Sequence, residues 1–456
     1  MLRASADAAP LPQSALEEAA GDIQKSKAAE ACTILRKYLK THAPNARAWN
    51  LLGVAEAERK HSTEAEGAFR TALKLDARLL AANENLGLLL FQKSDFAGAA
   101  RYLGNAADLA SRRPAVRFNL GVALLRSGQA QAARNQFVGL EAAWGNSASY
   151  WEERGAAELA VKSFRAAASS FDKALKIAPG SVRALNGAAI AAECQHDLDK
   201  AVALLVRARQ ASPEDVTTLV NFGRVCVERD LDDDAVEALT RVRSLAPENH
   251  QALYLLASAH LALEHYQASR DLLAEFVDEV PSYPTTYYAL GWIDVKLNGL
   301  ESARQEFQQC LRLSPQFQDA IYELAELDLR DNRLDAAEAG FRKVLALSPA
   351  HAKAAVGLGD TLVRRGQIDQ AQALYKQAIR SKPDWGAAHY KLAMLLLKKY
   401  DKTRGERERA LADELNKKES LDSRTRLKIL WPGGGPAEID QLAHSEGRIR
   451  KVQDLQ

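Results

Sequence analysis

The sequence predicts an all-α solenoid, in which helix–turn–helix repeats stack on one another along the chain. Three observations predict this fold class: a period of 34 residues, a column of small residues at that period, and a column of prolines at the same period. One helix pair cannot bury its apolar faces alone, so neighbouring repeats must complete the core.

A column of small residues marks the first helix of each repeat. It begins at Gly53 and recurs every 34 residues without insertion or deletion. Its members are Gly53, Gly87, Gly121, Gly155, Ala189, Gly223, Ala257, Gly291, Ala325, Gly359 and Ala393. A second small column begins at Ala65, with Ser269 as its one non-alanine member, and a large apolar column runs from Phe69 to Tyr375. Small side chains let two helix backbones approach closely, and the large ones fill the remaining space.

Turn and breaker residues set the ends of the two helices. With Gly53 numbered as the eighth residue of its repeat, apolar residues at helical spacing occupy columns 1–14 and 18–31. The residue between the two stretches is Gly128, Asn298, Asn332 or Gly366 in four of the repeats. Such residues favour the end of a helix. Proline at column 32, from Pro179 to Pro383, ends the second helix because it lacks an amide donor.

The residues in these columns resemble the tetratricopeptide repeat. One close match consists of Trp49, Leu52, Gly53, Ala65, Phe69 and Ala72. Another consists of Trp151, Gly155, Ala167, Phe171, Ala174 and Pro179. The resemblance implies a right-handed superhelix with a concave groove lined by the first helix of each repeat. It implies no single function, because this scaffold serves many unrelated roles.

The period divides the chain into five expected segments. They are a flexible N-terminus at 1–13, a degenerate helical pair at 14–45, ten consecutive repeats at 46–385, a degenerate last repeat with a capping helix at 386–419, and a tail with a candidate short helix at 420–456. The capping helix is highly charged, as the end of a solenoid requires. The tail either docks as an amphipathic helix or is a disordered end.

Charge and motifs argue against several functional classes. The chain has 61 Lys+Arg and 59 Asp+Glu, so no nucleic-acid partner is expected from its charge. No run of 18 apolar residues exists, so no transmembrane segment is expected. The four cysteines lack the short pairs of a metal site, and no phosphate-loop, H-E-x-x-H or G-x-S-x-G pattern occurs. We therefore expect no catalytic residue, no metal and no cofactor, and a protein that is not an enzyme.

The compartment is only weakly indicated. Residues 1–14 contain one Arg and no apolar core, so they do not form a complete signal peptide. The expected location is cytoplasmic, with a periplasmic or exported protein as the alternative if the true start lies upstream. The oligomeric state is left open.

Helix geometry predicts which residues face the groove. At 100° per residue, columns 2, 5, 9, 12 and 13 lie opposite the columns that pack on the second helix. In the second and third repeats this stripe is apolar, and its candidate partner-binding residues are Leu88, Phe91, Phe118 and Val122. An exposed apolar stripe usually marks a partner site. Two alternatives are partial burial between neighbouring helices and cover by the chain's own N-terminal segment.

In the later repeats the stripe becomes polar and aromatic. Its candidate residues are Arg224, Tyr254, Tyr288, Trp292, Tyr322 and Tyr390. Tyrosine joins a flat apolar face to a polar tip, which suits contact with an extended peptide or a sugar chain. The alternative is that tyrosine in this column is common throughout the family. Asn85, Asn119 and Asn221 lie at the groove's edge in column 6, where their amides are candidates to hold a peptide backbone.

The preferred functional hypothesis is a non-enzymatic scaffold that binds a peptide or a partner helix in the groove. A first alternative is an exported protein that binds glycan or other envelope components through the aromatic stripe. A second alternative is the recognition subunit of a separate transferase or kinase.

Overall fold

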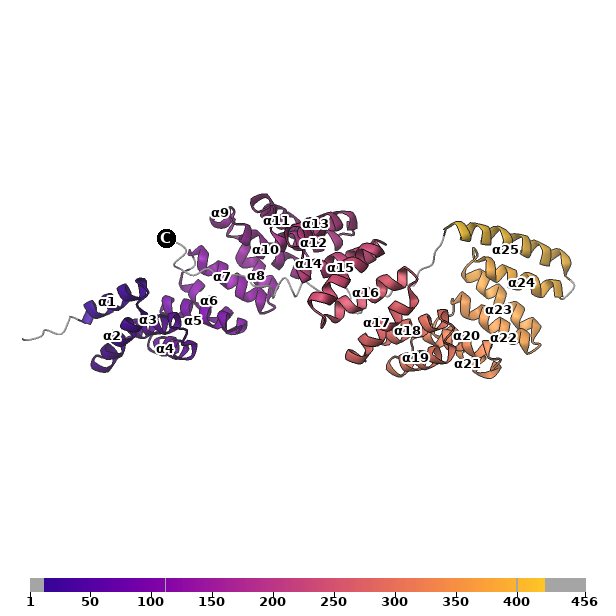
Figure 1. The fold of residues 1–456 in the computed structure, drawn as a ribbon, viewed down its shortest axis with the longest axis horizontal. Coiled ribbons are helices and arrows are strands. Elements are labelled where there is room, and N and C mark those ends of the chain that lie inside the picture. Colours follow the sequence, from indigo (N-terminus) through magenta and orange to yellow (C-terminus); the bar gives the residue numbers. More distant parts are fainter. Residues whose placement is uncertain (1–11, 111, 399–400, 423–456) are drawn as a thin grey trace, which may run out of the picture. The chain divides into compact units, whose positions relative to one another are not determined.

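The computed structural model describes residues 12–110, 112–398 and 401–422. Within these residues every regular element is an α-helix, and the helices alternate with short turns (Figure 1). The predicted all-α solenoid of tandem helix–turn–helix repeats is confirmed. No helix of this part of the chain is both long and apolar enough to cross a membrane. Most of the predicted N-terminal segment and most of the predicted tail lie outside the described residues.

The described residues fall into two compact units, which meet in sequence at Pro213 and Glu214. The first unit contains α1 (Pro12–Gln24), α2 (Ala28–Thr41), α3 (Ala46–Glu58), α4 (Ser62–Leu75), α5 (Leu80–Gln92), α6 (Phe96–Leu109), α7 (Pro114–Arg126), α8 (Ala130–Val138), α9 (Glu141–Trp144), α10 (Ala148–Ala160), α11 (Phe164–Ile177), α12 (Val182–Glu193) and α13 (Leu198–Ala211). The second contains α14 (Val216–Glu228), α15 (Asp232–Leu245), α16 (His250–Ala262), α17 (Tyr266–Glu279), α18 (Pro284–Lys296), α19 (Leu300–Leu313), α20 (Gln318–Arg330), α21 (Leu334–Leu347), α22 (Ala352–Arg364), α23 (Ile368–Ser381), α24 (Gly386–Lys398) and α25 (Lys402–Asp422).

The helix bounds follow the columns of the repeat. α3 begins at column 1 and α4 at column 17, and later pairs keep this register. The second helix of one repeat packs on the first helix of the next, as α4 does on α5 and α15 on α16. First helices of adjacent repeats also touch, as α5 touches α7 and α20 touches α22. Within a unit, the first helices therefore lie side by side, and residues that project from them share one face.

One turn residue per repeat adopts the left-handed backbone conformation. These residues have φ between 58° and 79° and recur every 34 residues: Ser26, Lys60, Ser94, Gly128, Lys162, His196, Asp230, Glu264, Asn298, Asn332 and Gly366. The amide of the following residue donates to a carbonyl five residues earlier, as from His61 to Glu56 (2.9 Å) and from Gly299 to Asp294 (2.7 Å). This bond ends the first helix in the Schellman manner. Its geometry is the same whether the residue is glycine, asparagine or lysine.

The glycines of the small column lie against large apolar side chains of the second helix. A Cβ atom on Gly53 would come within 2.5 Å of the Phe69 ring, and one on Gly291 within 2.7 Å of Phe307. Such distances are below any real carbon–carbon contact, so the phenylalanine occupies the space that a side chain would need. The sequence pairing of a small and a large column therefore corresponds to direct packing within a repeat.

The second helix of the repeat that starts at Pro114 departs from the predicted columns. A continuous helix over 131–144 is expected, but α8 ends at Val138 and the four-residue α9 follows. Gly139 weakens the helix at the break. In place of the regular helical bond, the carbonyl of Phe137 accepts from the Leu140 amide (3.0 Å) and from the Tyr150 hydroxyl (2.9 Å). The break brings Trp144 against Phe118, with ring centroids 5.4 Å apart.

Candidate ligand-binding groove

The apolar part of the predicted stripe is mostly covered by the chain itself. Phe118 is 2 % exposed and Val122 is fully buried, so neither offers a surface to a partner. Trp144 of α9, which neither of the two expected alternatives included, packs over Phe118. Leu88 and Phe91 remain partly exposed, and Phe91 packs edge-on against Phe96 with centroids 5.1 Å apart. The predicted exposed apolar stripe is therefore corrected to a small patch on α5.

One of the predicted asparagines joins two neighbouring first helices, and the other two are buried. The Asn85 amide donates to Oδ1 of Asn50 on the neighbouring first helix (3.0 Å). Asn119 and Asn221 are buried, and Oδ1 of Asn221 accepts from the Arg224 guanidinium (3.3 Å). Arg224 is also buried, and it lies 3.9 Å from Glu228. Burial removes Asn119, Asn221 and Arg224 from the surface of their units.

The tyrosine ladder is divided by burial. Tyr254 is 0 % exposed and packs edge-on against Phe276, with ring centroids 5.1 Å apart. Burial raises the pKa of its hydroxyl to about 12, and Thr285 and Thr286 of α18 lie beside that hydroxyl. Tyr254 is therefore a core residue, contrary to the expectation that it faces the groove. Tyr288 and Tyr322 are half-buried, and Tyr390 is exposed.

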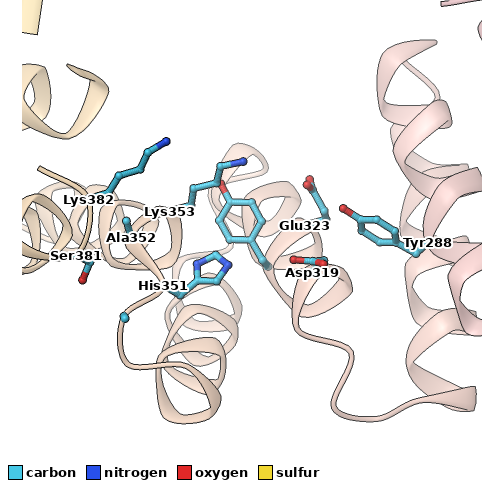
Figure 2. A pocket seen from close by; sticks show the side chains of 10 residues that line it. Tyr288, Asp319, Glu323, His351, Ala352, Lys353, Ser381 and Lys382 are labelled. Atoms are coloured by element: carbon cyan, nitrogen blue, oxygen red, sulfur yellow. The ribbon is translucent and has the colours of Figure 1, made fainter. Parts of the chain in front are cut away.

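Tyr288 and Tyr322 line an open pocket of about 390 Å³ in the second unit. The pocket is formed by α18, α20, the start of α22 and the end of α23 (Figure 2). Its lining residues are Tyr288, Asp319, Tyr322, Glu323, Ala350, His351, Ala352, Lys353, Ser381 and Lys382. A cavity of this size accommodates a few side chains or a small molecule.

Equivalent packing fixes the two tyrosines one repeat apart. The Tyr288 ring lies 5.9 Å from Phe307 and 5.3 Å from Phe317, centroid to centroid. The Tyr322 ring lies 5.9 Å from Phe341 and 5.5 Å from His351. Each ring is thus engaged by two neighbours, and Figure 2 shows the Tyr288 hydroxyl directed toward Glu323. Burial and nearby carboxylates raise the pKa of both hydroxyls, which therefore stay neutral donors at physiological pH.

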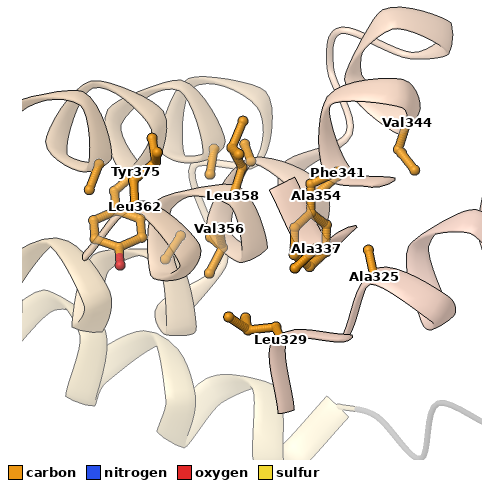
Figure 3. Packing of buried hydrophobic residues seen from close by; sticks show 14 of the residues in the cluster. Ala325, Leu329, Ala337, Phe341, Val344, Ala354, Val356, Leu358, Leu362 and Tyr375 are labelled. Atoms are coloured by element: carbon orange, nitrogen blue, oxygen red, sulfur yellow. The ribbon is translucent and has the colours of Figure 1, made fainter. Parts of the chain in front are cut away.

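The core behind the pocket holds α20 and α22 in place. Its buried cluster includes Ala325, Leu329, Phe341, Ala354 and Leu358 (Figure 3). A Cβ atom on Gly357 would meet the Phe341 ring at 2.5 Å and Oε1 of Glu326 at 3.0 Å. The absence of a side chain at this position leaves space for both groups, so glycine here helps to shape the wall next to Tyr322.

Three carboxylates project from one face of α20. Asp319, Glu323 and Glu326 are spaced so that they neighbour each other on the helix. Burial raises the pKa of Glu323 to about 7, with further increases from Glu326 and Asp319 and a partial offset by Lys353 and Lys296. Burial is also the main cause that raises the pKa of Glu326, and the negative charge of Asp360 raises it further. The Tyr322 hydroxyl, Lys391 and Lys353 act in the opposite direction. This wall of the pocket is electronegative and only partly compensated.

The opposite side of the pocket is basic. Lys353, Lys382 and His351 lie across the pocket from Tyr288 (Figure 2). His351 caps α22, because its Nδ1 accepts the amide of Ala354 (3.0 Å). The ring hydrogen is then on Nε2, which leaves a donor on the other edge of the ring.

Next to the pocket, Asp360 is fully engaged. Its carboxylate accepts from the Tyr375 hydroxyl and from Nζ of Lys391, each at 2.6 Å. Trp292 is half-buried, with Nζ of Lys296 4.6 Å from its ring centroid. Tyr390 on α24 is 42 % exposed and does not line the pocket. Of the predicted site residues, the structure thus brings only Tyr288 and Tyr322 into one pocket.

Tetratricopeptide repeat models match residues 16–79, 84–148, 118–182, 152–216, 233–284, 288–352 and 338–395, which is more than half of the chain. No curated protein matches it. Among solved structures, a tetratricopeptide repeat protein from Parabacteroides merdae is 18 % identical, with 58 % of this chain and 99 % of that chain covered and a TM-score of 0.45.

Two further structures show comparable similarity. The Cut9–Hcn1 hetero-tetramer of the APC/C is 13 % identical, covers 90 % of this chain and 88 % of its own, and has a TM-score of 0.41. YrrB, described as a TPR protein with an unusual peptide-binding site, is 21 % identical and has a TM-score of 0.36. The match covers 43 % of this chain and 97 % of the YrrB chain. Similarity at this level carries no conclusion about what the chain binds.

Proposed function

The chain belongs to the tetratricopeptide repeat family, and from this premise we propose that it is a non-catalytic scaffold that binds a partner peptide on the first-helix face of its second unit. Family membership supports a protein-interaction scaffold in general. The peptide groove and the lack of catalysis are our proposals.

The observation that carries the proposal is the pocket between Tyr288 and Tyr322. It opens on the face shared by first helices, where an extended chain can run from one repeat to the next. Its lining combines two tyrosine hydroxyls with acidic and basic side chains, which can pair with both the backbone and the side chains of a peptide. The size of the pocket suits a few side chains rather than a folded surface.

The geometry favours a peptide over a glycan. Sugar rings stack on exposed aromatic faces, but Tyr288 and Tyr322 each pack against two neighbouring rings. What these tyrosines offer the pocket is mainly their polar edge. The aromatic stripe is therefore a weaker argument for an envelope glycan ligand than its sequence suggests.

A pulldown with quantitative mass spectrometry tests the proposal. The wild-type chain is compared with Tyr288→Ala/Tyr322→Ala and with a matched control, Tyr102→Ala, a partly exposed tyrosine on α6 of the first unit. We expect the double variant to lose a defined set of partners that the control retains, with circular dichroism confirming that both variants fold. Identical partner profiles for all three proteins would remove the pocket from the function.

The same experiment separates the scaffold from the alternative of a recognition subunit. If the partners lost by the double variant are dominated by one transferase or kinase, the pocket serves recruitment to that enzyme. If they are unrelated proteins that share a sequence motif, the general scaffold is supported.

A further inference from the structure

The pocket on α20 and α22 is divided by charge. Asp319 and Glu323 lie next to Tyr288, while Lys353 and Lys382 lie on the far side (Figure 2). No hydrogen bond or ion pair within 4.0 Å joins the two sides in the described part of the chain. Acidic and basic side chains therefore face each other across the open pocket.

Glu323 is the more buried of the two carboxylates that line the pocket. It is half-buried, and within the described residues it has neither a hydrogen bond nor an ion pair. Its neighbours on the same helix, Asp319 and Glu326, repel its charge, and the cations that act on it, Lys296 and Lys353, only partly offset this. A ligand cation gains more binding free energy at a half-buried carboxylate between two tyrosines than at an exposed carboxylate, because the half-buried carboxylate is already partly desolvated.

The basic side offers a complementary place for an anion. Lys353 is exposed at the start of α22, and Lys382 directly follows α23. His351 completes this side with a ring edge that can donate a hydrogen bond. A ligand that carried only a cation would satisfy Glu323 but would meet repulsion from these lysines.

An extended peptide can present two opposite charges on one side of its backbone. Side chains at positions i and i+2 of an extended chain project on the same side, about 7 Å apart. We propose that the pocket binds an extended peptide segment with a Lys or Arg two residues away from an Asp or Glu, the cation beside Glu323 and the anion beside Lys353 and Lys382. This inference rests on the proposed function and specifies the class of partner.

Fluorescence anisotropy with defined peptides tests the inference on the full chain. Four labelled nine-residue peptides with blocked ends are compared, with Lys-Ala-Glu, Lys-Ala-Lys, Glu-Ala-Glu or Ala-Ala-Ala at the centre of one flexible sequence. We expect Lys-Ala-Glu to bind at least ten times more tightly than each of the other three, and its affinity to fall as salt is raised. Equal affinities for all four, or no binding of any up to millimolar concentration, would overturn the inference.

Protein variants assign the two charges to the two sides. Glu323→Gln is expected to weaken the binding of Lys-Ala-Glu several-fold without weakening that of Glu-Ala-Glu, and Lys353→Gln is expected to weaken the binding of both peptides. The exposed Glu301 on α19 provides the control, because Glu301→Gln removes the same charge outside the pocket. Equal losses for Glu301→Gln and Glu323→Gln would show a general charge effect and contradict the assignment.

The outcomes distinguish this inference from the proposed function. If partners in the pulldown depend on Tyr288 and Tyr322 but the four peptides bind equally, the groove binds peptides and the charge rule is wrong. If no partner depends on the two tyrosines, the proposed function itself fails, whatever the peptides do.

Discussion

His389 of α24 contacts both the capping helix α25 and the loop that precedes α24. Its Nδ1 lies 2.6 Å from a carboxylate oxygen of Glu408 on α25, and its Nε2 lies 3.0 Å from the Pro383 carbonyl. The imidazole is 5 % exposed, so both contacts are largely shielded from water. A carbonyl oxygen only accepts, so Nε2 donates to Pro383. One side chain therefore ties together three segments at the end of the second unit.

Removal of this imidazole should loosen the capping helix. His389→Ala leaves the Glu408 carboxylate and the Pro383 carbonyl without their partner, at a cost of roughly 1–3 kcal/mol. We expect faster amide hydrogen exchange along α24 and α25, with little change in α20 and α22. Glu406→Ala, at an exposed position on α25, is the matched control and should leave exchange unaltered. Exchange rates equal to those of the wild type would show that α25 is held by its apolar contacts alone.

Two glycines of one helix pair should respond to the same substitution in opposite directions. Gly53→Ala forces a Cβ into the Phe69 ring and should destabilise the first unit by roughly 1–3 kcal/mol. Gly67→Ala on α4 meets nothing within 4 Å and should stabilise it by about 0.5–1 kcal/mol, since alanine favours the helix. Urea unfolding followed by circular dichroism measures both. A stable Gly53→Ala variant would mean that α3 and α4 can move apart without loss.

The first unit contains a buried ion triad whose disruption should be costly. Glu153 lies 3.3 Å from Arg126 and 2.7 Å from Arg183, and both Glu153 and Arg126 are almost fully buried. Burial by itself would raise the pKa of Glu153, but the two arginines outweigh it and lower that pKa. Glu153→Ala leaves Arg126 buried and unpaired, so we expect a loss of roughly 3–5 kcal/mol.

The matched control for the triad is an exposed ion pair. Glu141 contacts Lys173 (2.9 Å) and Arg154 (3.3 Å) at the surface, so Glu141→Ala should cost less than about 1 kcal/mol. Because the pKa of Glu153 is lowered in the folded state, its contribution is present at neutral pH and lost as the pH falls through that lowered value. Denaturant titrations at pH 7 and pH 4 should therefore show a smaller difference between wild type and Glu153→Ala at pH 4.

Glu323 should make the second unit less stable at alkaline pH. Its folded-state pKa of about 7 lies above its ordinary range, so folding favours the protonated form. The contribution of Glu323 to the free energy of unfolding is therefore largest at low pH, declines as the pH rises toward 7 and stays reduced above pH 7. The charged groups around it are Asp319 and Glu326 on its own helix, Lys296 on α18 and Lys353 on α22.

The variant that isolates this effect is Glu323→Gln. It should stabilise the chain by roughly 1–3 kcal/mol at pH 8 and much less at pH 5. Thermal unfolding at the two pH values measures the difference, with Glu301→Gln as the control that should show none. A stabilisation of the same size at both pH values would trace the effect to packing rather than to charge.

The sequence predicts the helices well, because the repeat imposes the same packing problem eleven times. Gly53 and Phe69 recur as paired small and large columns, since each repeat must bring two helix backbones together around one large apolar side chain. Tyr288 and Tyr322, which helical periodicity assigns to the side of α18 and α20 opposite the second helices, both line the open pocket. These successes depend only on local periodicity.

The predicted exposure of a side chain is wrong where a neighbouring segment covers that side chain. Tyr254 occupies the same column as Tyr288, but Tyr254 is buried and its hydroxyl lies beside Thr285 and Thr286 of the following repeat. At the two positions that have the same relation to Tyr288, the sequence instead has Asp319 and Ala320. Phe118 is covered by Trp144 only because α8 breaks early. A helical wheel describes one helix and has no information about the residues that lie above it.

The pocket residues missed by sequence reasoning come from different parts of the repeat. Asp319 occupies a predicted groove column, and Glu323 occupies the edge column noted for asparagine. His351 and Lys382 lie near the ends of their repeats, where no pattern signals a surface role. Only the stacking of three successive repeats brings these positions together.

The left-handed turn residues carry a consequence for engineering. Lys60, Lys162 and Glu264 hold a backbone conformation that L side chains disfavour, once in each of three repeats. Replacing each with glycine should raise the free energy of unfolding by about 0.5–1 kcal/mol, and positions this far apart should add. The array therefore contains a set of evenly spaced points at which thermostability can be increased stepwise, without touching the pocket or the core.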